Sequence, residues 1–203
     1  MAKKHLPEKY ALISLSDKTG SELVAKRLVK IGFTVISSGG TAKYLRKKGL
    51  RNGKLIAVPK ITNWGPILDH RVVTLHPRIF GGILAKLPKH KRSMLHWHIP
   101  RIDFVYVGLY QIWNAKPDDP IEKIVELIDI GGVALLRAAA KNHERVIPAF
   151  DPKSCELALS TLETAGDLSV AQRIRFAADT LDYTSQYDKM ASTLLRGRIP
   201  LNG

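Results

Sequence analysis

Short apolar runs alternate with amphipathic stretches over the first sixty residues of the chain. Residues 10–14, 33–36 and 55–58 are apolar and rich in β-forming side chains, which is typical of buried strands. Between these runs, apolar residues recur at helical spacing over residues 21–31 and 42–48. The order strand, helix, strand, helix, strand requires parallel strands joined by right-handed crossovers. The pattern therefore predicts an α/β fold, with a mainly parallel sheet flanked by helices in three layers.

The second half of the chain continues this pattern after a stretch without clear periodicity. Residues 61–100 contain several proline and glycine residues and are predicted to be irregular. Further strands are predicted at residues 104–109 and 145–150. The predicted helices of this half cover residues 120–127, 134–141, 152–163 and 168–196. The length fits a single domain over residues 1–195, followed by a short tail at residues 196–203.

Composition excludes several classes of protein. The apolar share of 45% and the charged share of 25% are ordinary for a globular chain. No apolar run approaches the roughly 18 residues needed to cross a bilayer, and no apolar signal core follows the charged N-terminus. Cys155 is the single cysteine, which excludes an intrachain disulfide framework and a CxxC zinc site. A cytoplasmic location is expected.

Charge is distributed unevenly along the chain. Residues 1–100 carry 20 basic and 4 acidic side chains, whereas residues 101–203 carry 12 and 14. The net charge of +14 therefore comes from the N-terminal half, which predicts an anionic ligand or partner. Basic clusters at residues 46–54 and 86–92 leave a nucleic-acid-binding protein open as one alternative.

Two predicted strand-to-helix turns are rich in small hydroxyl and glycine residues. The first reads SDKTG at residues 16–20, and the second reads SGGT at residues 38–41. Such turns lie at the carboxyl ends of parallel strands, where N–H groups and hydroxyls at a helix start can hold a phosphate. Neither turn has the spacing of a Walker A loop or of a G-x-G-x-x-G fingerprint. Plain helix capping by serine and threonine is the alternative interpretation.

Further candidate groups lie in the middle of the chain. Residues 71–77 place an arginine, a threonine and a histidine on a segment without a predicted helix, where functional groups are common. Residues 129–132 lead into a predicted helix on which Arg137 and Lys141 share one face. The three alanines before Lys141 favour close packing and therefore a partly desolvated amine. The histidines form no metal-ligand pattern, so no metal site is predicted.

Six segments together carry a resemblance to a known family. They read SLSDKTG at 14–20, SGGTAK at 38–43, LDHRVVTLHP at 68–77, GGILA at 81–85, IDIGG at 128–132 and LRAAAKNH at 136–143. As a set, in this order and spacing, they resemble the inosine monophosphate cyclohydrolase domain, which is the N-terminal domain of the bifunctional purine-biosynthesis protein. The resemblance covers about residues 10–195. It implies a fold like that of methylglyoxal synthase.

The resemblance also implies an activity and the residues that perform it. Members close the ring of 5-formamidoimidazole-4-carboxamide ribotide with loss of water, giving inosine monophosphate, without a metal or organic cofactor. The implied substrate-binding residues are Ser16, Asp17, Lys18, Thr19, Ser38, Gly39, Gly40, Thr41, Arg71, Val72, Val73, Ile130 and Gly131. The implied catalytic residues are Lys141, Tyr110, Asp129 and Thr74, with Lys141 matching the family's proposed proton donor or acceptor. Proton exchange and close positioning of the two reacting groups are what this ring closure requires.

The chain departs from the family's pattern at two places. Where the family has Arg-Val-Lys-Thr, residues 71–74 read RVVT, so Val73 replaces a lysine considered part of the active site. Arg78 or Lys86, which are close in sequence, are the expected replacements for that cation. Where the family has Asn-Leu-Tyr-Pro-Phe, residues 108–112 read GLYQI, which lacks a base-contacting amide and an aromatic wall.

Three functions are therefore left open by the sequence. The first is a stand-alone inosine monophosphate cyclohydrolase, and the second is a purine-nucleotide or ribotide-binding module with weak, lost or redirected chemistry. The third is a nucleic-acid-binding protein. The family's transformylase domain is absent from the sequence, so we expect a separate transformylase to supply the formylated substrate. The resemblance further implies a homodimer.

Overall fold

A five-stranded parallel sheet forms the centre of the molecule. The computed structural model describes residues 8–51, 53–65, 67–69, 71–116 and 118–199. From edge to edge the strands are β3 (Leu55–Ala57), β2 (Thr34–Ser37), β1 (Lys9–Leu15), β4 (Arg101–Gly108) and β5 (Ile147–Ala149). Every paired strand runs parallel to its neighbour. The predicted α/β fold with a parallel sheet is confirmed.

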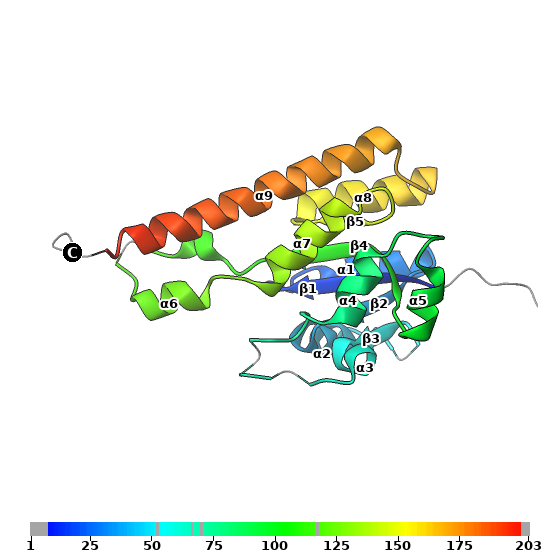
Figure 1. The fold of residues 1–203 in the computed structure, drawn as a ribbon, viewed down its shortest axis with the longest axis horizontal. Coiled ribbons are helices and arrows are strands. Elements are labelled where there is room, and N and C mark those ends of the chain that lie inside the picture. The colour runs from blue at the N-terminus through cyan, green and yellow to red at the C-terminus, as the bar shows by residue number, and fades with distance from the viewer. Residues whose placement is uncertain (1–7, 52, 66, 70, 117, 200–203) are drawn as a thin grey trace, which may run out of the picture.

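Helices cover both faces of this sheet, so the fold has three layers (Figure 1). One face is covered by α1 (Ser21–Lys30), α2 (Gly39–Lys47) and α8 (Pro152–Ala165). The other face is covered by α3 (Val58–Thr62), α4 (Pro77–Leu84) and α7 (Gly131–Lys141). The long helix α9 (Val170–Arg196) packs along α7 and β5. The remaining short helices are α5 (Lys91–His96), η1 (Ile112–Asn114) and α6 (Ile121–Glu126).

Alternation along the strands divides the core into two clusters. Ala11 and Ile13 of β1 belong to the cluster under α1 and α8, whereas Leu12 between them belongs to the cluster under α4 and α7. Successive side chains of a strand point to opposite faces, so a strand buried on both faces must be apolar throughout. This is why the short apolar runs of the sequence predict the strands well.

The prediction that residues 61–100 are irregular is wrong. Two helices, α4 and α5, lie within this segment. Pro77 opens α4, and the ring Nδ1 of His76 caps it by accepting the N–H of Arg78 at 3.1 Å. Gly82 sits within α4 because a Cβ there would lie 2.5 Å from the carbonyl oxygen of Pro100. A glycine that indicates a loop in the sequence is therefore required by close packing of a helix against the start of β4.

The order of the strands determines where a ligand can bind. From the central strand β1 the chain first builds outward through β2 and β3, and then returns to the other side of β1 with β4 and β5. The loops that follow β1 and β4 therefore separate at the carboxyl edge, which is where ligands bind in sheets of this kind. Within the described residues, no helix is both long enough and apolar enough to cross a membrane.

Candidate active site

A cavity of about 540 Å³ opens at the carboxyl edge of the sheet, between the loops that follow β1, β2 and β4 and the start of α7. Most of the residues predicted from the sequence line it. They are Ser16, Lys18, Ser38, Gly39, Gly40, Thr41, Arg71, Val73, Thr74, Tyr110, Asp129, Ile130 and Gly131. The volume lies within the range typical of small-molecule sites.

The turn after β1 is fixed to the end of β4. The N–H of Ser16 donates to the carbonyl oxygen of Gly108 at 3.0 Å, and its hydroxyl donates to the carbonyl oxygen of Leu109 at 2.6 Å. The ammonium of Lys18 donates to the carbonyl oxygen of Ser16 at 2.9 Å. A Cβ on Gly40 would lie 3.5 Å from Cε of Lys18, so this side chain extends over the start of α2. Lys18 therefore brings a positive charge to a helix N-terminus, which already favours anions.

The two predicted phosphate turns do not use their hydroxyls as helix caps. Gly20, with a φ of 73°, occupies the N-cap of α1, and Ser38 occupies the N-cap of α2 without a capping hydrogen bond. The Ser38 hydroxyl instead accepts the Ser14 hydroxyl at 3.2 Å. The Thr41 hydroxyl accepts the N–H of Leu15 at 3.2 Å. Because no side chain satisfies the first N–H groups of α2, they are available to an anionic ligand.

Asp17 and Thr19 stand apart from the cavity. One carboxylate oxygen of Asp17 accepts both the N–H of Thr19 at 3.0 Å and its hydroxyl at 2.8 Å. The same two hydrogen bonds hold the pKa of Asp17 below its ordinary value. Neither residue lines the cavity. The structure gives this pair a role in shaping the turn and no direct contact with the cavity.

Asp129 lies at the start of α7 and projects into the cavity. Its carboxylate accepts the N–H of Gly132 at 2.6 Å and also the backbone N–H of Tyr110. Burial raises the pKa of this carboxyl above its ordinary value, although the two hydrogen bonds act in the opposite direction. A Cβ on Gly132 would lie 2.6 Å from one carboxylate oxygen of Asp129, so only glycine allows this arrangement.

Thr74 and Tyr110 line the same cavity from two other segments. Thr74 is buried, and its hydroxyl lies 3.0 Å from the position that a Cβ would take on Gly131. Tyr110 lies two residues after the end of β4, is 47% exposed and lines the cavity. The cavity lining thus includes a partly buried carboxylate, a threonine hydroxyl and a phenol.

Arg71 forms an ion pair with a residue that the sequence did not single out. Its guanidinium contacts the carboxylate of Glu126, at the end of α6, and both side chains are largely exposed. Both residues line the cavity. Exposed pairs of this kind contribute only about 0–1 kcal/mol. A phosphate could therefore compete with Glu126 for Arg71 at little cost.

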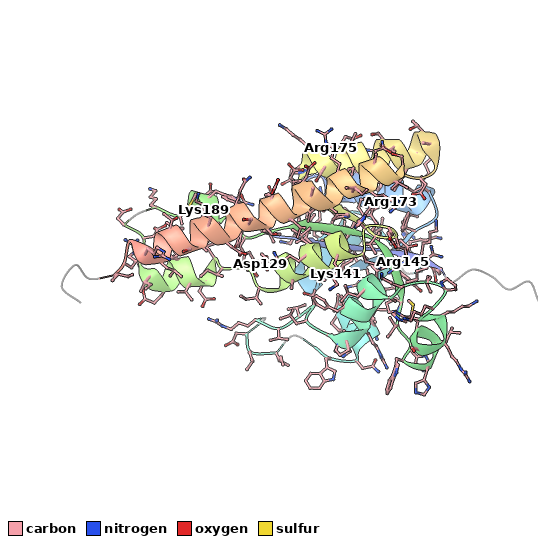
Figure 2. All side chains as sticks on the ribbon, turned by 45° about the horizontal axis from the view of Figure 1, so that its top comes forward. Asp129, Lys141, Arg145, Arg173, Arg175 and Lys189 are labelled. Carbon is pink, nitrogen blue, oxygen red and sulfur yellow. The ribbon has the colours of Figure 1, made fainter. Side chains whose placement is uncertain are left out.

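Lys141 is not part of this cavity, which corrects the prediction. It is the last residue of α7, whereas Asp129 precedes the first (Figure 2). A helix rises about 1.5 Å per residue, so ten residues carry the lysine roughly 15 Å from the cavity. Lys141 is also exposed. The expected desolvation of its amine is therefore wrong, and a single chain does not bring that amine to the other groups.

The other corrections concern the loop before α4. Val72 pairs with Ile67 in an isolated antiparallel bridge and does not line the cavity. Arg78 donates to the carbonyl oxygens of Trp97 and Ile61, at 3.1 and 2.9 Å, and does not line the cavity either.

Lys86 borders a different cavity. Neither expected replacement for the family's lysine is therefore present here. Among the described residues, Lys18 and Arg71 are the only cationic side chains that line the active-site cavity.

Sequence reasoning missed two kinds of residue at this site. Glu126 and Asp69 add carboxylates to the lining, and no role is predicted for either from the sequence, although Asp69 lies in the segment at residues 68–77. Tyr187 of α9 is fully buried behind the cavity, where its hydroxyl accepts the N–H of Asp129 at 3.0 Å and donates to the carbonyl oxygen of Leu127. Only contact in the folded chain reveals this link. In the described part of the chain, no group of three or more His, Cys, Asp or Glu residues could hold a metal ion.

Comparison with known proteins places these observations in a family. The MGS-like domain family matches residues 21–134, more than half of the chain. The family described as AICARFT/IMPCHase bienzyme matches residues 139–201. A solved structure, the crystal structure of ForH, has a TM-score of 0.82 and 32% sequence identity, covering 93% of this chain and 97% of that one.

Curated relatives include bifunctional purine biosynthesis proteins PurH from several bacteria. The protein of Acetivibrio thermocellus is 38% identical over 195 residues, and that of Fusobacterium nucleatum is 42% identical over 190 residues. These alignments cover 94% and 92% of this chain but 37% of each relative. The chain therefore spans little more than a third of the length of these relatives.

Proposed function

This chain belongs to the MGS-like domain family, and from that premise we propose that it is an inosine monophosphate cyclohydrolase acting in purine biosynthesis. The likeness to PurH proteins supports the role in purine biosynthesis. The reaction would be the dehydrative ring closure of 5-formamidoimidazole-4-carboxamide ribotide to inosine monophosphate. The observation that carries the proposal is that one cavity combines residues of the two turns proposed to bind phosphate with the partly buried carboxylate of Asp129.

Binding of the ribotide would follow the charge and hydrogen-bonding capacity of the cavity. The N–H groups at the start of α2 and the ammonium of Lys18 suit the phosphate. Arg71 can exchange Glu126 for a ligand oxygen. With the phosphate held at this end, the heterocycle would extend toward the start of α7. Fixing one end of the substrate in this way supplies the close approach that an intramolecular reaction needs.

The chemistry requires proton transfers in two steps. When the carboxamide nitrogen adds to the formyl carbon, one proton leaves nitrogen and one reaches the former formyl oxygen. A second proton then leaves the former formamide nitrogen and another reaches the hydroxyl oxygen, which departs as water while the C=N bond forms to that nitrogen. Asp129 is the base that accepts protons from nitrogen, because burial raises the pKa of its carboxyl toward the working pH. The hydroxyls of Tyr110 and Thr74 donate to the developing oxyanion.

The most direct test mixes the pure protein with the formylated ribotide and follows the ultraviolet change of ring closure. We expect a rate well above the spontaneous reaction. The same assay on Lys18→Ala should show a raised KM, because this variant loses a cation at the phosphate end. Lys153→Ala, which removes an exposed lysine outside the cavity, is the matched control and should leave the rate unchanged. Absence of any rate above the spontaneous reaction would contradict the proposal.

A second candidate function is a purine-nucleotide or ribotide-binding module with lost or redirected chemistry. Val73 and Gly108, which replace the family's lysine and amide, both line the cavity and favour this reading. Binding of inosine monophosphate without turnover would support this second candidate. Duplex binding that weakens steeply with salt, with no nucleotide binding, would support a nucleic-acid-binding protein instead.

Two partners belong to the proposal. A separate transformylase would supply the formylated substrate. A second copy of the chain would form a homodimer, and Ile130 supports this because it is 63% exposed on the rim of the cavity. Light scattering on the eluting protein measures the mass directly. A monomer of 22.6 kDa at assay concentration would contradict the dimer.

A further inference from the structure

A second cavity, of about 470 Å³, lies at the opposite end of β4 from the active-site cavity. Arg101, the first residue of β4, lines the second cavity, whereas Gly108, the last, lines the first. A strand rises about 3.3 Å per residue, so the seven steps between them separate the two cavities by roughly 23 Å. Nothing in the proposed reaction uses this second cavity.

Arg145 forms a fixed wall of the second cavity. Its guanidinium donates to the carbonyl oxygens of Gly82 at 2.7 Å, Ile83 at 2.8 Å, Ala85 at 3.2 Å and Ile102 at 2.9 Å, and it pairs with Asp103. These contacts use all five N–H donors of an arginine side chain. Arg145 therefore ties the end of α4 to the start of β4 and contributes charge to the cavity, but it has no donor left for a ligand.

Arg101 is in the opposite situation. Its side chain is 16% exposed, and its Nε lies 2.7 Å from a carboxylate oxygen of Asp103 without the alignment of a hydrogen bond. No described residue accepts a hydrogen bond from the Arg101 guanidinium. The other carboxylate oxygen of Asp103 accepts a hydrogen bond from Arg145. The buried Nε therefore has the charge of Asp103 nearby but no hydrogen-bond acceptor, and a buried donor that has lost water without gaining a hydrogen bond is costly.

Two lysines stand at the rim of the same cavity. Lys86 and Lys91 are exposed, and neither forms an ion pair with a described residue. Glu144 is the one acidic side chain among the described residues that line the cavity. Two arginines and two lysines thus face one lining carboxylate and the buried Asp103. The surplus is positive, and it lies where like charges repel unless an anion joins them.

We propose that the second cavity binds a small phosphorylated ligand through its phosphate group. The planar fork of Arg101 can give two parallel hydrogen bonds to a phosphate, and Lys86 and Lys91 complete the charge balance from the rim. The cavity is large enough to hold a group attached to that phosphate. The site is separate from the proposed cyclohydrolase cavity, and its existence does not depend on that activity. It also accounts for basic residues of the N-terminal half that the active-site cavity does not use.

The test is a titration of the full, ¹⁵N-labelled chain with inorganic pyrophosphate, followed by amide NMR. We expect saturable shifts at residues 86–91 and 142–145 for the second cavity, and separately at residues 16–20 and 38–41 for the first. The double variant Lys86→Ala with Lys91→Ala should weaken binding at the second cavity by about tenfold or more, since it removes two charge-assisted contacts. The first cavity should keep its affinity within about twofold, because the variant leaves its residues unchanged.

A matched double variant separates a built site from general attraction to a basic protein. Lys153→Ala with Lys189→Ala removes the same charge from exposed positions on α8 and α9. This control variant should keep the pyrophosphate affinity of each cavity within about twofold of the wild-type value. The proposal is overturned if residues 86–91 and 142–145 show no saturable shift. It is also overturned if the two double variants weaken pyrophosphate binding at the second cavity equally. Failure of the cyclohydrolase assay changes neither outcome, because this titration measures binding alone.

Discussion

The phenol oxygen of Tyr187 lies 3.0 Å from the backbone nitrogen of Asp129 and accepts its N–H. The same hydroxyl donates to the carbonyl oxygen of Leu127, so one side chain of α9 holds the backbone two residues before Asp129 and at Asp129 itself. The ring of Tyr187 packs edge-on against Trp113, with 5.6 Å between ring centroids. A helix that contributes no residue to the cavity lining therefore sets the position of the central carboxylate.

Tyr187→Phe removes this hydroxyl and keeps the packing of the ring. We expect the free energy of unfolding to fall by about 1–3 kcal/mol, because a buried N–H and a buried C=O lose their partner. Turnover should fall while nucleotide affinity stays within twofold, since no phosphate contact changes. Tyr183→Phe, on the same helix, is the control and should leave turnover unchanged.

If Tyr187 has a purely structural role, Tyr187→Phe should lower stability and leave the pH profile of turnover unchanged. Positioning of Asp129 predicts that the acid limb of that profile moves. Titration of the ¹³C-labelled Asp129 carboxyl in the two tyrosine variants measures the same effect without any assay. Identical Asp129 titrations in both variants would exclude the positioning role.

Asp129→Asn tests the carboxylate itself. Burial raises its pKa, so the wild-type carboxyl ionises above the ordinary value of about 3.9. Turnover should rise with pH through that raised pKa, and the asparagine variant should lose this limb and about 10²–10⁴-fold in kcat. An acid limb retained in the variant would assign the limb to another group.

The same shift predicts how stability depends on pH. The folded-state pKa of Asp129 lies above the unfolded value, so its contribution favours the folded state fully below the unfolded pKa. That contribution is lost as pH rises through the folded pKa. Denaturant unfolding at a series of pH values should therefore show wild type losing stability relative to Asp129→Asn across this window.

Val73→Lys restores the cation that the family has at this position. Val73 lines the cavity, so a lysine there can reach the ligand. We expect turnover to rise on the order of tenfold, because a cation near the formyl oxygen stabilises the charge that develops there. Val72→Lys is the matched control, since Val72 does not line the cavity. Equal effects of the two variants would mean that the added charge acts only at long range.

Glu126→Gln should strengthen nucleotide binding. The carboxylate of Glu126 pairs with Arg71 and also adds negative charge to the cavity. An exposed pair of this kind is worth about 0.2–1 kcal/mol, so we expect affinity for inosine monophosphate to rise up to about fivefold. Glu122→Gln, an exposed residue of the same helix outside the cavity lining, should have no effect. Calorimetry at low salt measures the difference, and weaker binding by Glu126→Gln would contradict this assignment.

The sequence predicts the strands well because their central residues are buried on both faces of the sheet and are therefore mostly apolar. The sequence does not predict α4, because Gly82 indicates a helix-breaking position. In the structure, the close approach of the Pro100 carbonyl oxygen is what requires glycine there. Gly82 and Pro100 come into contact only in the folded chain. The hydrophobic periodicity of one segment therefore does not reveal this contact.

The position of the two turns at one cavity was predictable, because parallel strands bring their carboxyl ends to one edge of the sheet. Lys141 was not, because its place in a motif says nothing about which end of α7 faces the cavity. Tyr187 lies 58 residues after Asp129, and only folding brings the two together. The role of Glu126 was likewise not predictable, because its ion pair with Arg71 forms only when the chain folds.

The hydrogen bond from the Ser16 hydroxyl to the carbonyl oxygen of Leu109 joins residues 93 positions apart, across the central pair of strands. A nucleotide that contacts the turns after β1 and β2 and also the start of α7 would span the same junction. It would act as a reversible cross-link between the two halves of the sheet, stabilising the folded chain in proportion to how far its concentration exceeds Kd. Where degradation follows the population of opened molecules, the lifetime of this protein in the cell would then rise and fall with the supply of its own substrate.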